Sequence, residues 1–191
     1  MSNLSDSEVQ ELLSRFLKGE EQAFTELVRK YQKKAYYFAY RFTHNHQDAE
    51  DLSQEAFIHA YRSLKKFKSR SSFFTWFYRI LVNLCINFHR RRSVQVYVPV
   101  EDIAVSDPDA LSIVESKELG MKIHRAIEKL PLRQKAVFIL RQIEELSFEE
   151  VSESMGCSVG AAKASYFQAV RKLQKYLKGE INSKSLTGSK K

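Results

Sequence analysis

Residues 94–116 of this 191-residue chain contain acidic residues but no lysine or arginine. Two of the three prolines of the chain, Pro99 and Pro108, lie in this segment. Proline lacks a backbone N–H and interrupts helices, so a long helix is not expected there. On both sides of this segment, glycine and proline are scarce and apolar residues recur at steps of three and four, which is typical of amphipathic helices. The pattern predicts two helical units joined by an extended acidic linker.

The predicted fold class is therefore all-α, with two small helical domains. The first domain is assigned to residues 1–93, the linker to 94–116 and the second domain to 117–179. The last segment, 180–191, is rich in serine and lysine and is expected to be a disordered tail. Hydrophobic residues make up 43% of the chain, which is enough to form packed cores.

Charge and composition restrict the kind of partner and the compartment. The net charge of +8 favours an acidic partner such as nucleic acid. No apolar run approaches the ~20 residues that a membrane-spanning helix needs, so the protein is not expected to be embedded in a membrane. The N-terminus is polar, and the cysteines, Cys85 and Cys157, lie far apart in helical patterns. We expect a cytoplasmic protein with free, buried thiols.

The segment from Arg62 to Arg92 combines positive charge with aromatic side chains. It holds nine lysines and arginines, no acidic residue and the only tryptophan of the chain, Trp76. Cations bind a phosphate backbone and aromatic faces stack on unpaired bases, so the segment predicts binding to single-stranded or melting nucleic acid. Phe73, Phe74, Trp76 and Tyr78 cannot all lie on one helical face. One or more of them is expected to be exposed.

The segment from Phe148 to Phe167 has the pattern of a helix-turn-helix. A capping box at Ser147–Glu150 begins the first helix, and Ser158 is a candidate N-cap for the second. Basic side chains such as Lys163 and Arg171 are expected on the outer side of the second helix. A helix of this kind can enter the major groove of duplex DNA.

Two other functions are weighed against this interpretation. A metal-dependent nuclease could use His44, His46 and Asp48, but this spacing offers no convincing ligand set. A dimeric helix-turn-helix regulator that acts without a polymerase would not need the segment 62–92 or the acidic residues at 51–55. No catalytic residue set, cofactor site or metal site is expected.

Three stretches in order resemble those of one bacterial family. They are Asp48–Phe57, Phe67–Arg92 and the stretch from Leu130 through Leu173. Together they resemble the extracytoplasmic-function (ECF) type of RNA polymerase sigma factor. In that family the first stretch docks on the polymerase, the second melts and reads the minus-ten element, and the third binds the minus-thirty-five element. The resemblance covers residues 21–177 of the chain.

The resemblance implies three sets of site residues. The set implied for binding to the polymerase core is Asp48, Glu50, Asp51, Gln54, Glu55 and Phe57. The set implied for minus-ten DNA is Lys66, Lys68, Arg70, Ser71, Ser72, Phe74, Trp76, Tyr78, Arg79, Asn83, His89, Arg90, Arg91 and Arg92. The set implied for the helix-turn-helix is Ser158, Gly160, Ala161, Lys163, Ala164, Tyr166, Phe167 and Arg171.

The resemblance also implies partners and a location. The partners are core RNA polymerase, through the clamp helices of its largest subunit and its flap region, and promoter DNA, both as duplex and as the single nontemplate strand. An anti-sigma factor is a further implied partner. The protein would be cytoplasmic and nucleoid-associated, or held at the membrane by that anti-sigma factor. It would not be an enzyme.

Overall fold

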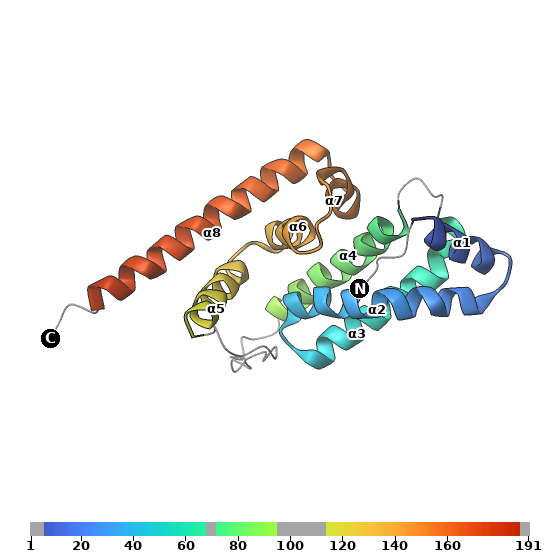
Figure 1. Ribbon diagram of the computed structural model, residues 1–191, viewed down its shortest axis with the longest axis horizontal. Coiled ribbons are helices and arrows are strands. Elements are labelled where there is room, and N and C mark those ends of the chain that lie inside the picture. The colour runs from blue at the N-terminus through green and yellow to red at the C-terminus, as the bar shows by residue number, and fades with distance from the viewer. Residues whose placement is uncertain (1–5, 68–71, 95–113, 188–191) are drawn as a thin grey trace.

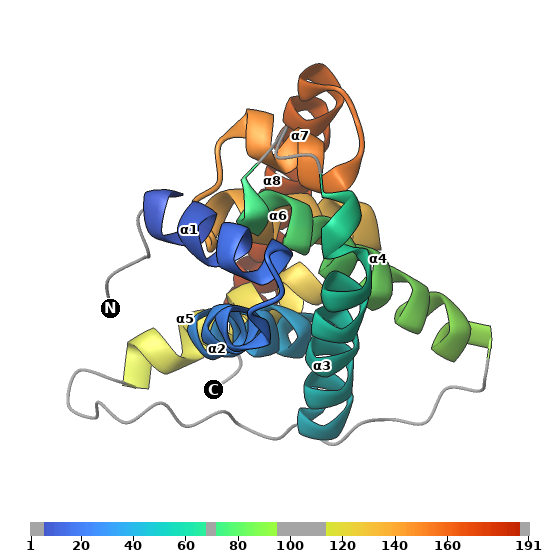
Figure 2. The ribbon, with the colours of Figure 1, turned by 90° about the vertical axis from the view of Figure 1, so that its right-hand side faces the viewer.

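The computed structural model describes residues 6–67, 72–94 and 114–187, and these are almost entirely helical (Figures 1 and 2). Within these ranges there is no strand, and the elements in chain order are α1 (Asp6–Leu17), α2 (Glu21–Thr43), α3 (His46–Ser63), the 3₁₀ turn η1 (Leu64–Lys66), α4 (Phe73–Val94), α5 (Val114–Glu128), α6 (Leu132–Gln142), α7 (Phe148–Met155) and α8 (Val159–Thr187). The predicted all-α class is confirmed. Most of the predicted acidic linker lies outside the described residues.

Helices α1 to α4 form the N-terminal bundle. Helix α2 packs against α1 and α3, and α3 in turn packs against α4. Leu27, Phe38, Phe42 and Leu81 are fully buried in its core. The rings of Phe38 and Phe42, one helical turn apart, stack with centroids 5.3 Å apart. Burial of this apolar face accounts for the helical spacing that the sequence carries.

A tight turn at His44 and Asn45 joins α2 to α3. His44 adopts a left-handed conformation with φ of 51°, and its N–H donates to the carbonyl of Tyr40. The side chain of Asn45 then accepts a hydrogen bond of 3.0 Å from the N–H of Asp48. Asn45 is therefore the N-cap, and α3 begins at His46.

The helix-turn-helix prediction is confirmed in its local geometry. Ser147 Oγ accepts from the N–H of Glu150 at 3.1 Å, and the Glu150 carboxylate accepts from the N–H of Ser147 at 2.8 Å, which completes the capping box of α7. Gly156 ends α7 with φ of 61°. Ser158 Oγ then accepts from the N–H of Ala161 at 3.2 Å and caps α8.

Helix α8 is longer than the sequence predicts. It buries Ala162, Ala169 and Leu173 and continues to Thr187. The helix thus includes residues 180–187, which the sequence assigned to a disordered tail. Residues 188–191 lie outside the described ranges.

The two predicted domains are packed together. Helix α7 lies on α4 (Figure 2). A single cluster of buried side chains includes residues of α1–α4 together with residues of α6, α7 and the start of α8. Small buried side chains line the contact: Ser154 of α7 donates a 3.2 Å hydrogen bond to the carbonyl of Thr75 in α4. The structure therefore has a closed arrangement in which the two domains share one core, and a smaller cluster of Ala126, Leu130, Ala169 and Leu173 lies within the second domain.

The turn of the helix-turn-helix yields a stability prediction. Gly156→Ala should lower the free energy of unfolding by about 1–2 kcal/mol, because an L-residue is strained at this positive φ. The new Cβ would also meet the Arg79 guanidinium at 3.4 Å. Urea unfolding followed by circular dichroism measures the change.

Gly160→Ala is the matched control for this substitution. Gly160 lies in the first turn of α8, and a methyl group added there would meet no heavy atom within 4 Å outside the backbone of its own helix. Alanine should stabilise the helix there by about 0.5–1 kcal/mol. Equal destabilisation by both substitutions would contradict the conformational explanation.

Candidate functional site

The solvent-facing side of α3 carries a row of acidic and amide side chains. Glu50, Asp51, Gln54 and Glu55 are all exposed. Spacings of three and four residues place Asp51, Gln54 and Glu55 on one side of the helix. Ile58, which is 50% exposed, adds an apolar side chain one turn after Gln54. We call these five residues the α3 acidic face; it can accept hydrogen bonds from a basic partner.

Asp48, at the start of α3, is already engaged within the molecule. Its Oδ2 lies 2.6 Å from Nη1 of Arg92, near the end of α4. The Arg92 guanidinium also lies 5.8 Å from the centre of the Phe88 ring. The structure thus joins one residue predicted for polymerase binding to one predicted for DNA binding, and their contact ties α4 to α3.

Phe57, which was predicted to bind the polymerase core, is not part of the exposed face. It is 8% exposed, and its ring stacks on Phe77 of α4 with centroids 4.6 Å apart. Helical geometry explains this: Phe57 follows Leu52, Ser53 and Ala56 on the inward side of α3. Its role is to hold α3 on α4.

The four aromatic residues at the start of α4 divide into two pairs. Phe73 and Tyr78 are buried, at 1% exposure each. Phe74 and Trp76 are half-buried. The indole of Trp76 contacts Phe67 at a centroid distance of 5.0 Å. None of the four is fully exposed in the closed arrangement, so a stacking role for Phe74 or Trp76 needs further uncovering of its ring.

Tyr78 was predicted to contact DNA, but in this conformation it belongs to the contact between the domains. Its hydroxyl donates a 2.6 Å hydrogen bond to Oε2 of Glu144, which follows α6. Arg41 of α2 lies 3.2 Å from the other oxygen of that carboxylate. Burial and the nearby Glu144 charge hold the pKa of Tyr78 well above its ordinary value, so the phenol stays protonated and donates.

The remaining polar residues predicted on α4 are mostly accessible. Arg79, Asn83, Arg90, Arg91 and Arg92 are exposed. They place most of the positive charge at the C-terminal end of the helix. This part of α4 can hold an anionic backbone without a change in the fold.

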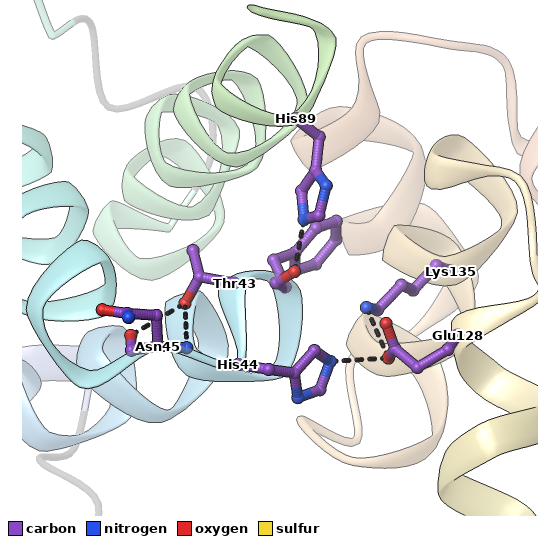
Figure 3. A network of polar contacts seen from close by, with 7 residues as sticks. Thr43, His44, Asn45, His89, Glu128 and Lys135 are labelled. Carbon is purple, nitrogen blue, oxygen red and sulfur yellow. Dashed lines mark hydrogen bonds and ion pairs between the residues drawn. The ribbon is translucent and has the colours of Figure 1, made fainter. Parts of the chain in front are cut away.

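His89 differs from these neighbours because it is half-buried. Its Nε2 contacts the carbonyl oxygen of Phe42, as Figure 3 shows. Burial lowers the pKa of His89, which favours the neutral ring. The histidine therefore ties α4 to the end of α2.

The loop before α4 is described only in part. The side chain of Lys66 and residues 68–71, which include Lys68, Arg70 and Ser71, lie outside the described ranges. Ser72 has a structural role, because its Oγ accepts a 3.1 Å hydrogen bond from the N–H of Thr75. This bond satisfies a free donor in the first turn of α4.

The outer side of α8 is accessible over its first four turns. The exposed residues predicted for DNA binding are Ser158, Gly160, Ala161, Lys163, Ala164, Phe167 and Arg171. Phe167 is 58% exposed. Tyr166 is the exception: it is half-buried, and its hydroxyl donates a 3.0 Å hydrogen bond to Gln142 of α6. Tyr166 thus supports the helix-turn-helix from within.

A groove marks where the helix-turn-helix meets α4. Its α4 wall is Thr75, Trp76 and Arg79, and its other wall is Ser152, Glu153 and the turn 156–158. Two surfaces predicted to bind different parts of a nucleic acid therefore face each other across it. In the closed arrangement Trp76 is partly covered, whereas Arg79 and Ser158 stay exposed.

A second polar contact between the domains was missed in the sequence (Figure 3). Glu128, the last residue of α5, lies 2.7 Å from Nε2 of His44 and 2.7 Å from Nζ of Lys135. Burial raises the pKa of Glu128, but the contacts with His44 and Lys135 lower it more, to about 2, so the carboxylate is charged. Lys135 is 2% exposed and lies over the Phe42 ring. The sequence signal that could have indicated this contact was a lysine, Lys135, among the inward-facing positions of α6.

The metal-ligand set considered for a nuclease does not assemble. His46 Nδ1 forms a 2.5 Å hydrogen bond with the Tyr36 hydroxyl. Asp48 pairs with Arg92, while His44 points towards Glu128. These three side chains therefore have separate partners, which contradicts that alternative.

Comparisons with known proteins match both halves of the chain. Residues 27–94 match the family model "Sigma-70 region 2", and residues 120–173 match "Sigma-70, region 4". The fold and its surfaces thus define a two-domain protein of the sigma-70 class. More particularly, the chain belongs to the ECF family of bacterial RNA polymerase sigma factors.

Three curated relatives carry the family assignment. The RNA polymerase sigma-H factor of Pseudomonas aeruginosa is 37% identical over 91% of this chain and 96% of its own length. The ECF sigma factor SigW of Bacillus subtilis is 32% identical over 89% and 97%, respectively. The ECF sigma-E factor of Escherichia coli is 36% identical over 84% and 89%.

Two solved structures share the fold. CnrH, in complex with the cytosolic domain of CnrY, aligns with a TM-score of 0.69 at 21% identity, over 90% of this chain and 98% of that one. The sigma factor RpoE of Bartonella quintana, in complex with the anti-sigma factor NepR, aligns with a TM-score of 0.65 at 24% identity, over 81% and 96%. Among the described residues of our protein, no helix has the length and apolar character to cross a membrane.

The different burial of two neighbours on α3 gives a direct test of the site boundary. Phe57→Ala should lower the free energy of unfolding by about 3–5 kcal/mol, because it leaves a cavity beside Phe77. Ile58→Ala should change it by less than about 0.5 kcal/mol, because Ile58 is half exposed. Thermal or urea unfolding measures both, and similar losses would contradict the assignment of Phe57 to the core.

Proposed function

We propose that this alternative sigma factor binds core RNA polymerase through the α3 acidic face. The observation that carries the proposal is the exposure of Asp51, Gln54 and Glu55 together on one side of a helix whose other side is fixed in the core. The partner surface would be the clamp helices of the largest polymerase subunit, with the flap region receiving the C-terminal domain. Buried Phe57 would keep the face rigid without touching the partner.

Promoter recognition would divide between the two domains. The exposed arginines at the end of α4 would hold the backbone near the minus-ten element, with Asn83 beside them. Lys163, Phe167 and Arg171 would contact the minus-thirty-five duplex from α8. Trp76 and Phe74 would stack on bases of the nontemplate strand once they are uncovered.

The closed arrangement sets a condition on that recognition. Tyr78 is buried against Glu144, and Trp76 lies in the groove beside the turn 156–158. Single-stranded DNA could reach these rings only if the helix-turn-helix domain moved away from α4. Open and closed forms would therefore differ in promoter binding.

An anti-sigma factor is the proposed regulatory partner. It would bind both domains and favour the closed form. The RpoE structure of similar fold was solved in complex with the anti-sigma factor NepR, which supports a partner of this class. The sigma factor would act in the cytoplasm and on the nucleoid, and a membrane-bound anti-sigma factor would hold it near the membrane.

Run-off transcription from a fork-junction promoter with core polymerase tests this function. The wild-type chain should bind the core and support a transcript. Asp51→Lys should weaken core binding by at least about tenfold, because it places a like charge opposite a basic partner surface. Binding measured by fluorescence anisotropy separates this loss from any later step.

Glu11→Lys is the control, because it makes the same charge change at an exposed position of another helix, α1. It should bind the core as the wild type does. Absence of both core binding and transcription with the wild-type chain would refute the proposed function. Equal binding by Asp51→Lys and the wild type would refute the role of the α3 acidic face.

A further inference from the structure

We propose that His44, His124 and Glu128 form a binding site for a divalent transition metal of the zinc class, which links the two domains. The candidate ligand atoms of these three side chains lie within 4.8 Å of one another. His44 belongs to the region 2 match and the other two to the region 4 match. A metal there would connect the end of α2 to α5.

Backbone geometry brings the three side chains together. His44 takes the left-handed conformation that ends α2, with φ of 51°, so its ring leaves the helix in the direction of α5 (Figure 3). His124 and Glu128 are four residues apart on α5 and thus lie on the same side of that helix. The rings of His44 and His124 are perpendicular, with centroids 4.6 Å apart.

The contact between His44 and Glu128 is close but poorly formed as a hydrogen bond. Nε2 of His44 lies 2.7 Å from Oε1 of Glu128. Nevertheless this buried nitrogen has no partner that meets the angular requirements of a hydrogen bond. A ring nitrogen that faces a carboxylate in this way is suited to share a cation with it.

The donor set suits zinc chemistry. Zinc binds imidazole nitrogen and carboxylate oxygen at about 2.0–2.2 Å and accepts three protein ligands with water as the fourth. His124 and Glu128 are exposed and His44 is half-buried, so an ion and its water can reach the site. Small side-chain rotations would bring the ligand atoms to these distances.

Lys135 is the competing cation at this site. Its Nζ lies 2.7 Å from Oε1 of Glu128 and 5.1 Å from the centre of the Phe42 ring. His44 faces the same carboxylate oxygen, so lysine and metal would share or compete for this glutamate. The lysine charge would weaken metal binding, which suits a reversible contact better than a permanent structural ion.

A metal bound by these three residues would stabilise the closed arrangement of the two domains. Because they come from both domains, only the closed arrangement presents all three. A ligand that binds one conformation alone favours it by the factor 1 + [L]/Kd, so zinc at 100 times its Kd would favour closure about 100-fold. The regulatory consequence rests on the proposed sigma-factor function, but the metal site itself does not.

Titration of the full chain with zinc chloride, followed by isothermal calorimetry, tests the site. One zinc per chain is expected for the wild type. His124→Ala should weaken binding by at least about tenfold. His59→Ala is the matched control, because His59 also lies four residues from a glutamate, Glu55, but on α3 away from the interface. It should bind zinc as the wild type does.

Resonance energy transfer between fluorophores on α2 and α8 is the second measurement. It reports the distance between the two domains and needs no polymerase or promoter. Zinc should increase the closed fraction in the wild type and in His59→Ala, but not in His124→Ala. Failure of the wild type to bind zinc would overturn the proposal. Zinc binding that His124→Ala leaves intact would also overturn it, because the ion would then have other ligands, such as the Cys157 thiol. Zinc binding without any gain in the closed fraction would overturn it as well.

Discussion

The carboxylate of Glu144 imposes the main constraint on this structure. It is 9% exposed as a side chain, and its partners, Tyr78 and Arg41, both belong to the other domain. A buried charge is stable only when it is paired and hydrogen-bonded. The two domains must therefore stay packed while Glu144 is buried, or separate far enough for water to replace its partners. Hydrogen bonds to charged groups contribute about 1.5–3 kcal/mol each, so a macromolecular partner can reverse the packing.

The proposed binding surfaces differ in how exposed they are while the two domains are packed together. The α3 acidic face and the outer side of α8 are exposed while the domains are packed, whereas Tyr78 is buried and Trp76 is only partly accessible. Core polymerase could thus engage α3 first, before the DNA-reading side of α4 is uncovered. Small side chains at the contact, Thr75, Ser154 and Gly156, let α7 approach α4 closely.

Local features of this fold could be predicted from the sequence, and the contacts between domains could not. The capping box at Ser147–Glu150 and the cap at Ser158 depend on neighbouring residues, so their pattern was sufficient. The exposed part of α3 followed from helical spacing, although Phe57, named with the polymerase-binding residues, is buried. Tyr78–Glu144 and His44–Glu128 join residues far apart in the chain. No spacing rule predicts such pairs, since they depend on how two finished domains meet.

The distance between the two domains, before and after polymerase binding, tests the central claim most directly. Spin labels at exposed Lys30 of α2 and Lys178 of α8, with Cys157→Ser to remove the more accessible native thiol, would report it by pulsed electron resonance. We predict that short distances predominate in the free chain, with a shift to longer distances with core polymerase and a fork-junction promoter. An unchanged distribution in the presence of an active transcription complex would contradict the account.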